Sequence, residues 1–262
     1  AGIQLGLLYY NDNQPEKALA AYKQVISNYP GSEEAKIALQ DLKSVYIDLN
    51  DINAYASYVN SIGGNIRLEV GEQDSLTYIA AEKLFMRGDN DGARRSLINY
   101  LQTFPEGAFS SNANFYLGSI AFAKKEFDEA IQRFKLVIAS GDTKFLEESV
   151  ARTAEIEYLS KDYPAALESF KRLQIVAENP ENRQAARLGI MRCALQTGQQ
   201  KDALLAADEL LKEPKLSPEL EAEARYVRAK AYIAQKQANK ALADLKELSK
   251  DTRTVHGAEA KY

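Results

Sequence analysis

One short pattern recurs along the whole chain and constrains its fold more than any other feature. In each copy a small alanine is followed four residues later by a larger or apolar residue. These register alanines are Ala18, Ala54, Ala93, Ala130, Ala166, Ala203 and Ala241, and they are 36, 39, 37, 36, 37 and 38 residues apart. Such periods are typical of solenoids, in which each unit buries its apolar face against its neighbours. The sequence therefore predicts a stacked repeat protein, and it favours binding over catalysis.

Each unit is expected to contain two amphipathic helices. In the fourth unit, residues 112–124 and 128–139 both carry apolar side chains at spacings of three and four. Polar turns that contain Asn, Asp, Gly or Pro separate the helices, as at residues 11–15, 87–91 and 161–164. We therefore expect the second helix of each unit to fold back on the first.

Composition excludes several classes of function. The 262 residues include 33 Lys and Arg against 37 Asp and Glu, so the net charge of −4 creates no strong field that would attract nucleic acid. No stretch approaches the 18 or so apolar residues that a membrane span needs. The single cysteine, Cys193, cannot form an internal disulfide.

The repeated residues resemble the tetratricopeptide repeat. The first unit carries the pattern at Leu5, Gly6, Tyr9, Ala18, Tyr22 and Pro30, and the fourth carries it at Leu117, Gly118, Ala130 and Phe134. Leu42 and Met191 replace the glycine in the second and sixth units. The resemblance implies an all-α fold: a right-handed α-α superhelix of about seven helix pairs plus the start of an eighth.

The register divides the chain into repeats within a single solenoid. The expected ranges are 1–31, 32–73, 74–109, 110–145, 146–181, 182–217, 218–255 and a partial repeat at 256–262. Because neither end has a polar capping unit, we expect an internal fragment of a longer array, with self-association through the uncapped ends as a further alternative.

Residues 104–118 also resemble repeats of bacterial envelope proteins, of the outer-membrane assembly lipoprotein and cell-division coordinator type. This resemblance implies a periplasmic or outer-membrane-associated protein. A cytoplasmic location is the alternative.

Three features of the sequence could be sites of chemistry. The long link at residues 61–74 holds three glycines but lacks the lysine and hydroxyl residue of a phosphate-binding loop, which favours a plain loop. His256 is the only histidine and is expected at the surface or at a helix start, and Cys193 is expected to be a buried, inert thiol. We predict no catalytic, cofactor-binding or metal-binding residues and no cofactor.

A binding groove is predicted from helix geometry. The residue eleven positions before each register alanine should face the hollow side of the superhelix, where aromatic residues four positions earlier would border it. The predicted groove residues are Lys43, Tyr78, Glu82, Phe115, Ser119, Glu155, Arg192, Tyr226 and Lys230. A core position is the alternative interpretation for the aromatic members of this set.

The sequence thus favours a non-enzymatic scaffold that binds a peptide or a partner helix in its groove. Two alternatives stay open. The array could be a structural arm of a bacterial envelope assembly, or a regulatory module of an enzyme whose catalytic domain lies outside this chain.

Overall fold

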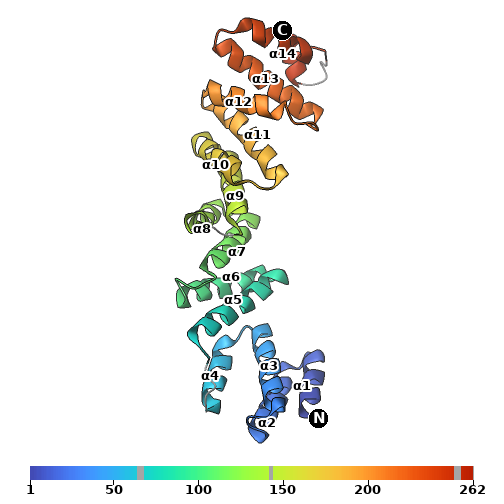
Figure 1. The fold of residues 1–262 in the computed structure, drawn as a ribbon, viewed down its shortest axis with the longest axis vertical. Coiled ribbons are helices and arrows are strands. Elements are labelled where there is room, and N and C mark those ends of the chain that lie inside the picture. The colour runs from blue at the N-terminus through green and yellow to red at the C-terminus, as the bar shows by residue number, and fades with distance from the viewer. Residues whose placement is uncertain (64–67, 142–143, 251–254, 262) are drawn as a thin grey trace. The chain divides into compact units, whose positions relative to one another are not determined.

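The computed structural model describes residues 1–63, 68–141, 144–250 and 255–261, and within these ranges all regular secondary structure is helical (Figure 1). The helices are α1 (Gly2–Asn11), α2 (Pro15–Asn28), α3 (Glu33–Asp48), α4 (Ile52–Ile62), α5 (Val70–Met86), α6 (Asn90–Thr103), α7 (Ser110–Ala123), α8 (Phe127–Ala139), α9 (Leu146–Leu159), α10 (Tyr163–Val176), α11 (Pro180–Gln196), α12 (Gln200–Leu210), α13 (Pro218–Ala234), α14 (Ala238–Leu248) and α15 (Val255–Lys261). The predicted all-α solenoid fold is confirmed.

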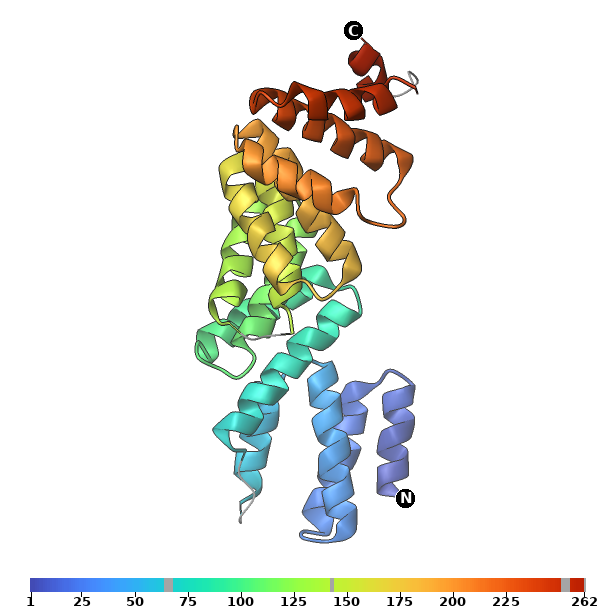
Figure 2. The same ribbon diagram turned by 45° about the horizontal axis from the view of Figure 1, so that its top comes forward.

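The helices form two compact units, residues 1–120 and 121–262, and the boundary falls within α7. In the first unit α1 and α3 lie side by side with α2 packed on both (Figures 1 and 2). In the second unit α10 packs on α9 and α11, and α12 packs on α11 and α13. The first helices of consecutive repeats also contact each other, α9 with α11 and α11 with α13. This arrangement places the first helices next to one another within each unit.

Small residues let the helices approach closely. Six of the register alanines are buried, and Ala54 is half-buried. A methyl group added at Gly6 would come within 2.5 Å of the ring of Tyr22, which lies in the second helix of the same repeat. The twelve-residue spacing between Gly6 and Ala18 therefore marks a tight helix crossing, as the sequence predicts.

The turn inside each repeat uses one left-handed residue. Five positions before the register alanine, the backbone has a positive φ at Asn13, Gly88, Lys125, Lys161, Gly198 and Lys236. In the second repeat the equivalent residue, Asn50, lies four positions before Ala54. The polar turns predicted at residues 11–15, 87–91 and 161–164 are confirmed, because the chain passes from one helix to the next at residues 12–14, 87–89 and 160–162.

The link predicted at residues 61–74 is shorter than expected. Helix α4 continues to Ile62 and α5 begins at Val70, because Glu69 already accepts backbone hydrogen bonds from Glu72 and Gln73. Of the remaining loop, residues 64–67 lie outside the described residues.

Candidate binding surface

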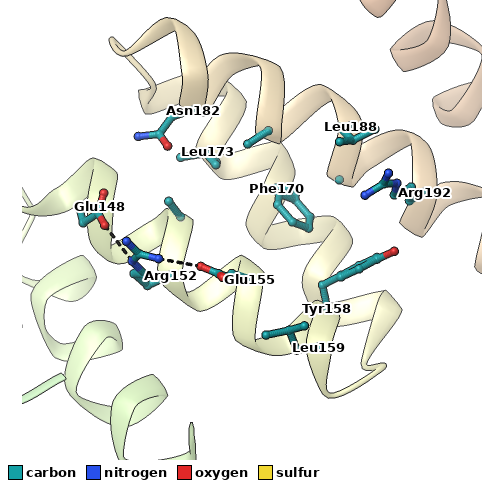
Figure 3. A pocket seen from close by; sticks show the side chains of 13 residues that line it. Glu148, Arg152, Glu155, Tyr158, Leu159, Phe170, Leu173, Asn182, Leu188 and Arg192 are labelled. Carbon is teal, nitrogen blue, oxygen red and sulfur yellow. Dashed lines mark hydrogen bonds and ion pairs between the residues drawn. The ribbon is translucent and has the colours of Figure 1, made fainter. Parts of the chain in front are cut away.

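A hollow of about 290 Å³ lies in the second unit between α9 and α11, the first helices of two consecutive repeats (Figure 3). Helix α10 lies behind it. The lining residues are Glu148, Ala151, Arg152, Glu155, Tyr158, Leu159, Phe170, Leu173, Asn182, Ala185, Leu188, Gly189 and Arg192. Most of these side chains are apolar, and the charged ones come only from α9 and α11.

The floor of this hollow is part of the core. Phe170 and Leu173 of α10 are 8% and 1% exposed. A methyl group at Gly189 would lie 2.4 Å from the ring of Phe170, so α11 contacts the ring with its backbone. Because the floor is held by close packing, the hollow keeps its form without a ligand.

One end of the rim is built around Arg152. Its guanidinium donates to Glu148 at 2.8 Å and to Glu155 at 2.9 Å, as the dashed lines in Figure 3 show. The same group lies over the ring of Phe122, 4.9 Å from its centroid. Two carboxylates from the same helix thus surround one arginine.

The other end of the rim holds Arg192 beside Tyr158 (Figure 3). Arg192 donates through Nε and Nη2 to the two oxygens of Glu223 in α13, at 2.6 and 2.7 Å. These hydrogen bonds raise the pKa of the guanidinium above its ordinary value. A forked pair of this kind fixes the direction of the side chain.

Glu147, beside Glu148 on α9, joins α9 to the start of α11. It accepts hydrogen bonds from the amides of Glu178 and Asn179, at 2.9 and 3.2 Å, and from Asn182 Nδ2 at 2.7 Å. Burial alone would raise the pKa of Glu147, but these hydrogen bonds outweigh burial and lower the pKa. The contact holds one wall of the hollow in place.

Of the predicted groove residues, the structure brings Glu155 and Arg192 together in this hollow. Lys43 lines a separate hollow of about 280 Å³ in the first unit, where its Nζ lies 3.2 Å from Glu72. The other residues of that hollow are Lys36, Leu39, Gln40, Tyr55, Val59, Leu68 and Glu72.

Tyr78 is buried, which agrees with the core position given as the alternative for the aromatic members of the predicted groove. Its side chain is 3% exposed, because Phe109 stacks on its ring at 4.5 Å. Its hydroxyl donates to Glu82 at 2.6 Å, and Tyr116 donates to the same carboxylate at 2.8 Å. Burial, together with the bond to Glu82, raises the pKa of Tyr78. The carboxylate of Glu82 thus accepts hydrogen bonds from two tyrosines.

Phe115 and Ser119 line neither hollow. Phe115 is half-buried against the ring of Tyr116, at 5.7 Å. The hydroxyl of Ser119 donates back to the carbonyl of Phe115 at 2.9 Å. The hydroxyl proton of Ser119 is thus used within α7, while the oxygen can still accept a hydrogen bond.

Tyr226 and Lys230 also lie outside the hollow of the second unit. His256 of α15 stacks on Tyr226 with ring centroids 4.6 Å apart, and Lys230 Nζ lies 5.1 Å from the Tyr226 centroid. His256 is half-buried in the first turn of α15, so the predicted helix start is confirmed. The aromatic ring is therefore shared between an imidazole and an ammonium group.

Several residues of the hollow lie outside the predicted set of groove residues. Arg152, Tyr158, Leu159 and Asn182 were not predicted, yet they form much of its rim. Arg152, Tyr158 and Leu159 lie three or four residues from Glu155, one turn along the same helix. Adding one helical turn on each side of Glu155 would have found these three residues, whereas Asn182 lies ten residues before Arg192 and would still have been missed.

The described residues show no arrangement typical of metal chemistry. No group of three or more His, Cys, Asp or Glu that could hold a metal ion occurs among them. In the same part of the chain no helix is long and apolar enough to cross a membrane. Cys193 is buried, as predicted, and burial raises the pKa of its thiol to about 11.

Comparison with known proteins agrees with this geometry. The sequence pattern of the tetratricopeptide repeat family matches residues 1–32 and 80–143. Within these two segments the chain carries tetratricopeptide repeats. No curated protein matches the chain.

Two solved structures show the same fold at low sequence identity. YrrB, a TPR protein with an unusual peptide-binding site, is 18% identical, with 71% of this chain and 90% of that chain covered and a TM-score of 0.53. The C-terminal part of a TPR repeat-containing protein from Cytophaga hutchinsonii is 15% identical, with 99% of both chains covered and a TM-score of 0.51. These matches support the solenoid fold. They do not identify a binding partner.

Proposed function

We propose that this protein is a non-enzymatic scaffold, and that the hollow between α9 and α11 receives an apolar side chain from a peptide segment of a partner protein. The observation that carries this proposal is the hollow itself, with an apolar floor and a charged rim fixed by hydrogen bonds. Apolar pockets with a few oriented polar groups are typical of binding sites. The peptide-binding site named for YrrB, which has a similar fold, is consistent with this use.

The size of the hollow limits the strength of binding. Complete burial of one Leu or Phe side chain contributes about 1.5–3 kcal/mol, so one anchor alone gives weak affinity. The rest must come from polar contacts along the rim and from ordered backbone contacts. We therefore expect short peptides to bind with micromolar dissociation constants.

Selection from a library of random 12-residue peptides tests the proposal. The selected peptides are labelled with a fluorophore, and their affinity for the unaltered protein and for Ala185→Trp is measured by anisotropy. Ala185 is exposed in the hollow, so the indole fills the space without entering the core. Loss of the anchor should weaken binding by about 10- to 100-fold.

The matched control is Ala243→Trp, an exposed alanine on α14 in the same unit but outside the hollow. This variant should bind the peptides as tightly as the unaltered protein. If Ala185→Trp binds them equally well, or if no peptide is selected, the hollow is not the binding site.

A structural arm of a bacterial envelope assembly is the second candidate, and it is supported by the resemblance of residues 104–118. It predicts a periplasmic or outer-membrane-associated protein. Fractionation of cells that produce the full-length gene product tests it, and recovery of the protein in the cytoplasmic fraction alone would contradict it.

A further inference from the structure

We infer that the hollow between α9 and α11 selects segments in which a lysine or arginine lies next to the apolar anchor. This inference rests on the proposed function and adds the chemistry of the partner. It follows from the charges that surround the hollow and from how they are already paired.

The charged rim residues, taken together with the partner of Arg192, carry an excess of negative charge. Four charged residues line the hollow: Glu148, Arg152, Glu155 and Arg192. Glu223 joins this group because it is paired to Arg192. Three carboxylates against two guanidinium groups leave one negative charge next to the apolar floor.

Both arginines are already paired with carboxylates of the chain. Arg152 uses Nε and Nη1 for Glu148 and Glu155, and Arg192 uses Nε and Nη2 for Glu223. Each guanidinium has five N–H donors, so an incoming carboxylate could reach the remaining ones, but there it would lie beside Glu148, Glu155 or Glu223. Like charges in contact oppose binding.

The two carboxylates on α9 can accept further bonds where they are. Their side chains are 41% and 45% exposed, for Glu148 and Glu155. The hydrogen bonds to Arg152 use Oε1 of Glu148 and Oε2 of Glu155, and an ionised carboxylate has about four acceptor positions. A lysine or arginine of the partner can therefore pair with either group while Arg152 stays in place.

The test uses one peptide that binds the unaltered protein but binds Ala185→Trp much more weakly. Its binding therefore depends on the hollow. Its basic residue is replaced by Gln and by Glu in two synthetic versions, and all three are measured by anisotropy at about 50 mM salt. An exposed ion pair contributes up to about 1 kcal/mol, so we expect the Gln version to bind about 3-fold more weakly than the basic peptide. The Glu version adds repulsion and should bind about 10-fold more weakly. The differences should shrink at about 0.5 M salt, since screening acts on exposed charges.

The deciding variant is Glu148→Gln combined with Glu155→Gln, which frees Arg152 and makes the rim positive by one charge. The preference should reverse, so that the Glu peptide binds more tightly than the basic one. A structural effect alone would weaken all three peptides equally. The control is Glu168→Gln combined with Glu247→Gln, two exposed carboxylates of the same unit that do not line the hollow, and it should keep the original preference.

The outcomes separate the two proposals. If peptides require the hollow but bind equally with Lys, Gln or Glu, the charge inference is wrong and the proposed function stands. Equal loss of all three peptides in the Gln double variant also overturns the inference. If no peptide depends on Ala185, both proposals fall.

Discussion

The hollows of the two units have nearly equal volumes, about 280 Å³ in the first and 290 Å³ in the second, but their rims are built differently. Lys43 and Arg192 occupy the same repeat position, eleven residues before the register alanine. Lys43 makes one contact with Glu72 at 3.2 Å, whereas Arg192 makes two with Glu223 at 2.6 and 2.7 Å. Lysine is a mobile point charge and arginine is a planar fork. One repeat position can therefore give an adjustable rim or a fixed one.

The turns of the two units differ as well. The first unit places Asn13, Asn50 and Gly88 at the left-handed position, and the second places Lys125, Lys161, Gly198 and Lys236 there. Asn and Gly adopt this conformation readily, while it costs most other residues about 1–2 kcal/mol. The second unit thus combines a more rigid rim with more strained turns.

The largest expected loss of stability comes from a substitution in the floor of the second hollow. Phe170→Ala should lower the free energy of unfolding by about 3–5 kcal/mol, since it leaves a cavity beneath Gly189. Denaturation with urea measures the change. Ile175→Ala, at an 85% exposed position on the same helix, is the control and should stay within about 0.5 kcal/mol of the unaltered protein. A small loss in Phe170→Ala would mean that the floor is not part of the core.

The next effect tests the difference between the rims. Arg192→Ala should lower the free energy of unfolding by about 1 kcal/mol, because Glu223, which is 20% exposed, loses a partner that donates two hydrogen bonds. Lys43→Ala should cost about 0.3 kcal/mol, since its pair is exposed and makes a single contact. Equal losses in thermal denaturation would remove the distinction between a fixed and an adjustable rim.

The turns give a smaller effect of opposite sign. Lys161→Gly should raise the free energy of unfolding by about 0.5–1 kcal/mol, because relief of the left-handed strain exceeds the entropy cost of glycine. Asn13→Gly should change the free energy of unfolding by no more than about 0.3 kcal/mol, since Asn tolerates this conformation. Urea denaturation of both variants checks the pair, and a loss of stability in Lys161→Gly would contradict it.

The smallest expected effect is a pH dependence at the wall of the second hollow. The pKa of Glu147 is lowered in the folded state, so its contribution is complete above the ordinary value of 4.5 and is lost as pH falls through the lowered pKa. Glu147→Gln should therefore lose less stability than the unaltered protein between about pH 4.5 and pH 3. Parallel melting curves at several pH values measure this, and identical slopes would show that Glu147 does not hold the wall.

The sequence was sufficient to predict the helix pairs, since the register alanines and the turn residues act locally. It could not predict which members of one register position are buried. Tyr78 and Tyr226 are equivalent in the repeat, but Phe109 covers the first and His256 stacks on the second. Phe109 lies in the turn before α7 and His256 lies in α15, so the effect of both covering residues depends on tertiary packing. The same reason explains why the charge pairing of Arg192 with Glu223 could not be predicted.

The left-handed turn residue also determines where the chain tolerates a change of length. Its distance from the register alanine is five residues in six of the described turns, while the repeat period varies from 36 to 39. One residue inserted between them would rotate the second helix by about 100° and turn its charged face toward its partner. Insertions should thus be accepted between helix pairs and rejected within them. Each pair could then be exchanged whole, and moving the hollow of the second unit into another array would require α9 to α12 together with α13, which carries Glu223, the partner of Arg192.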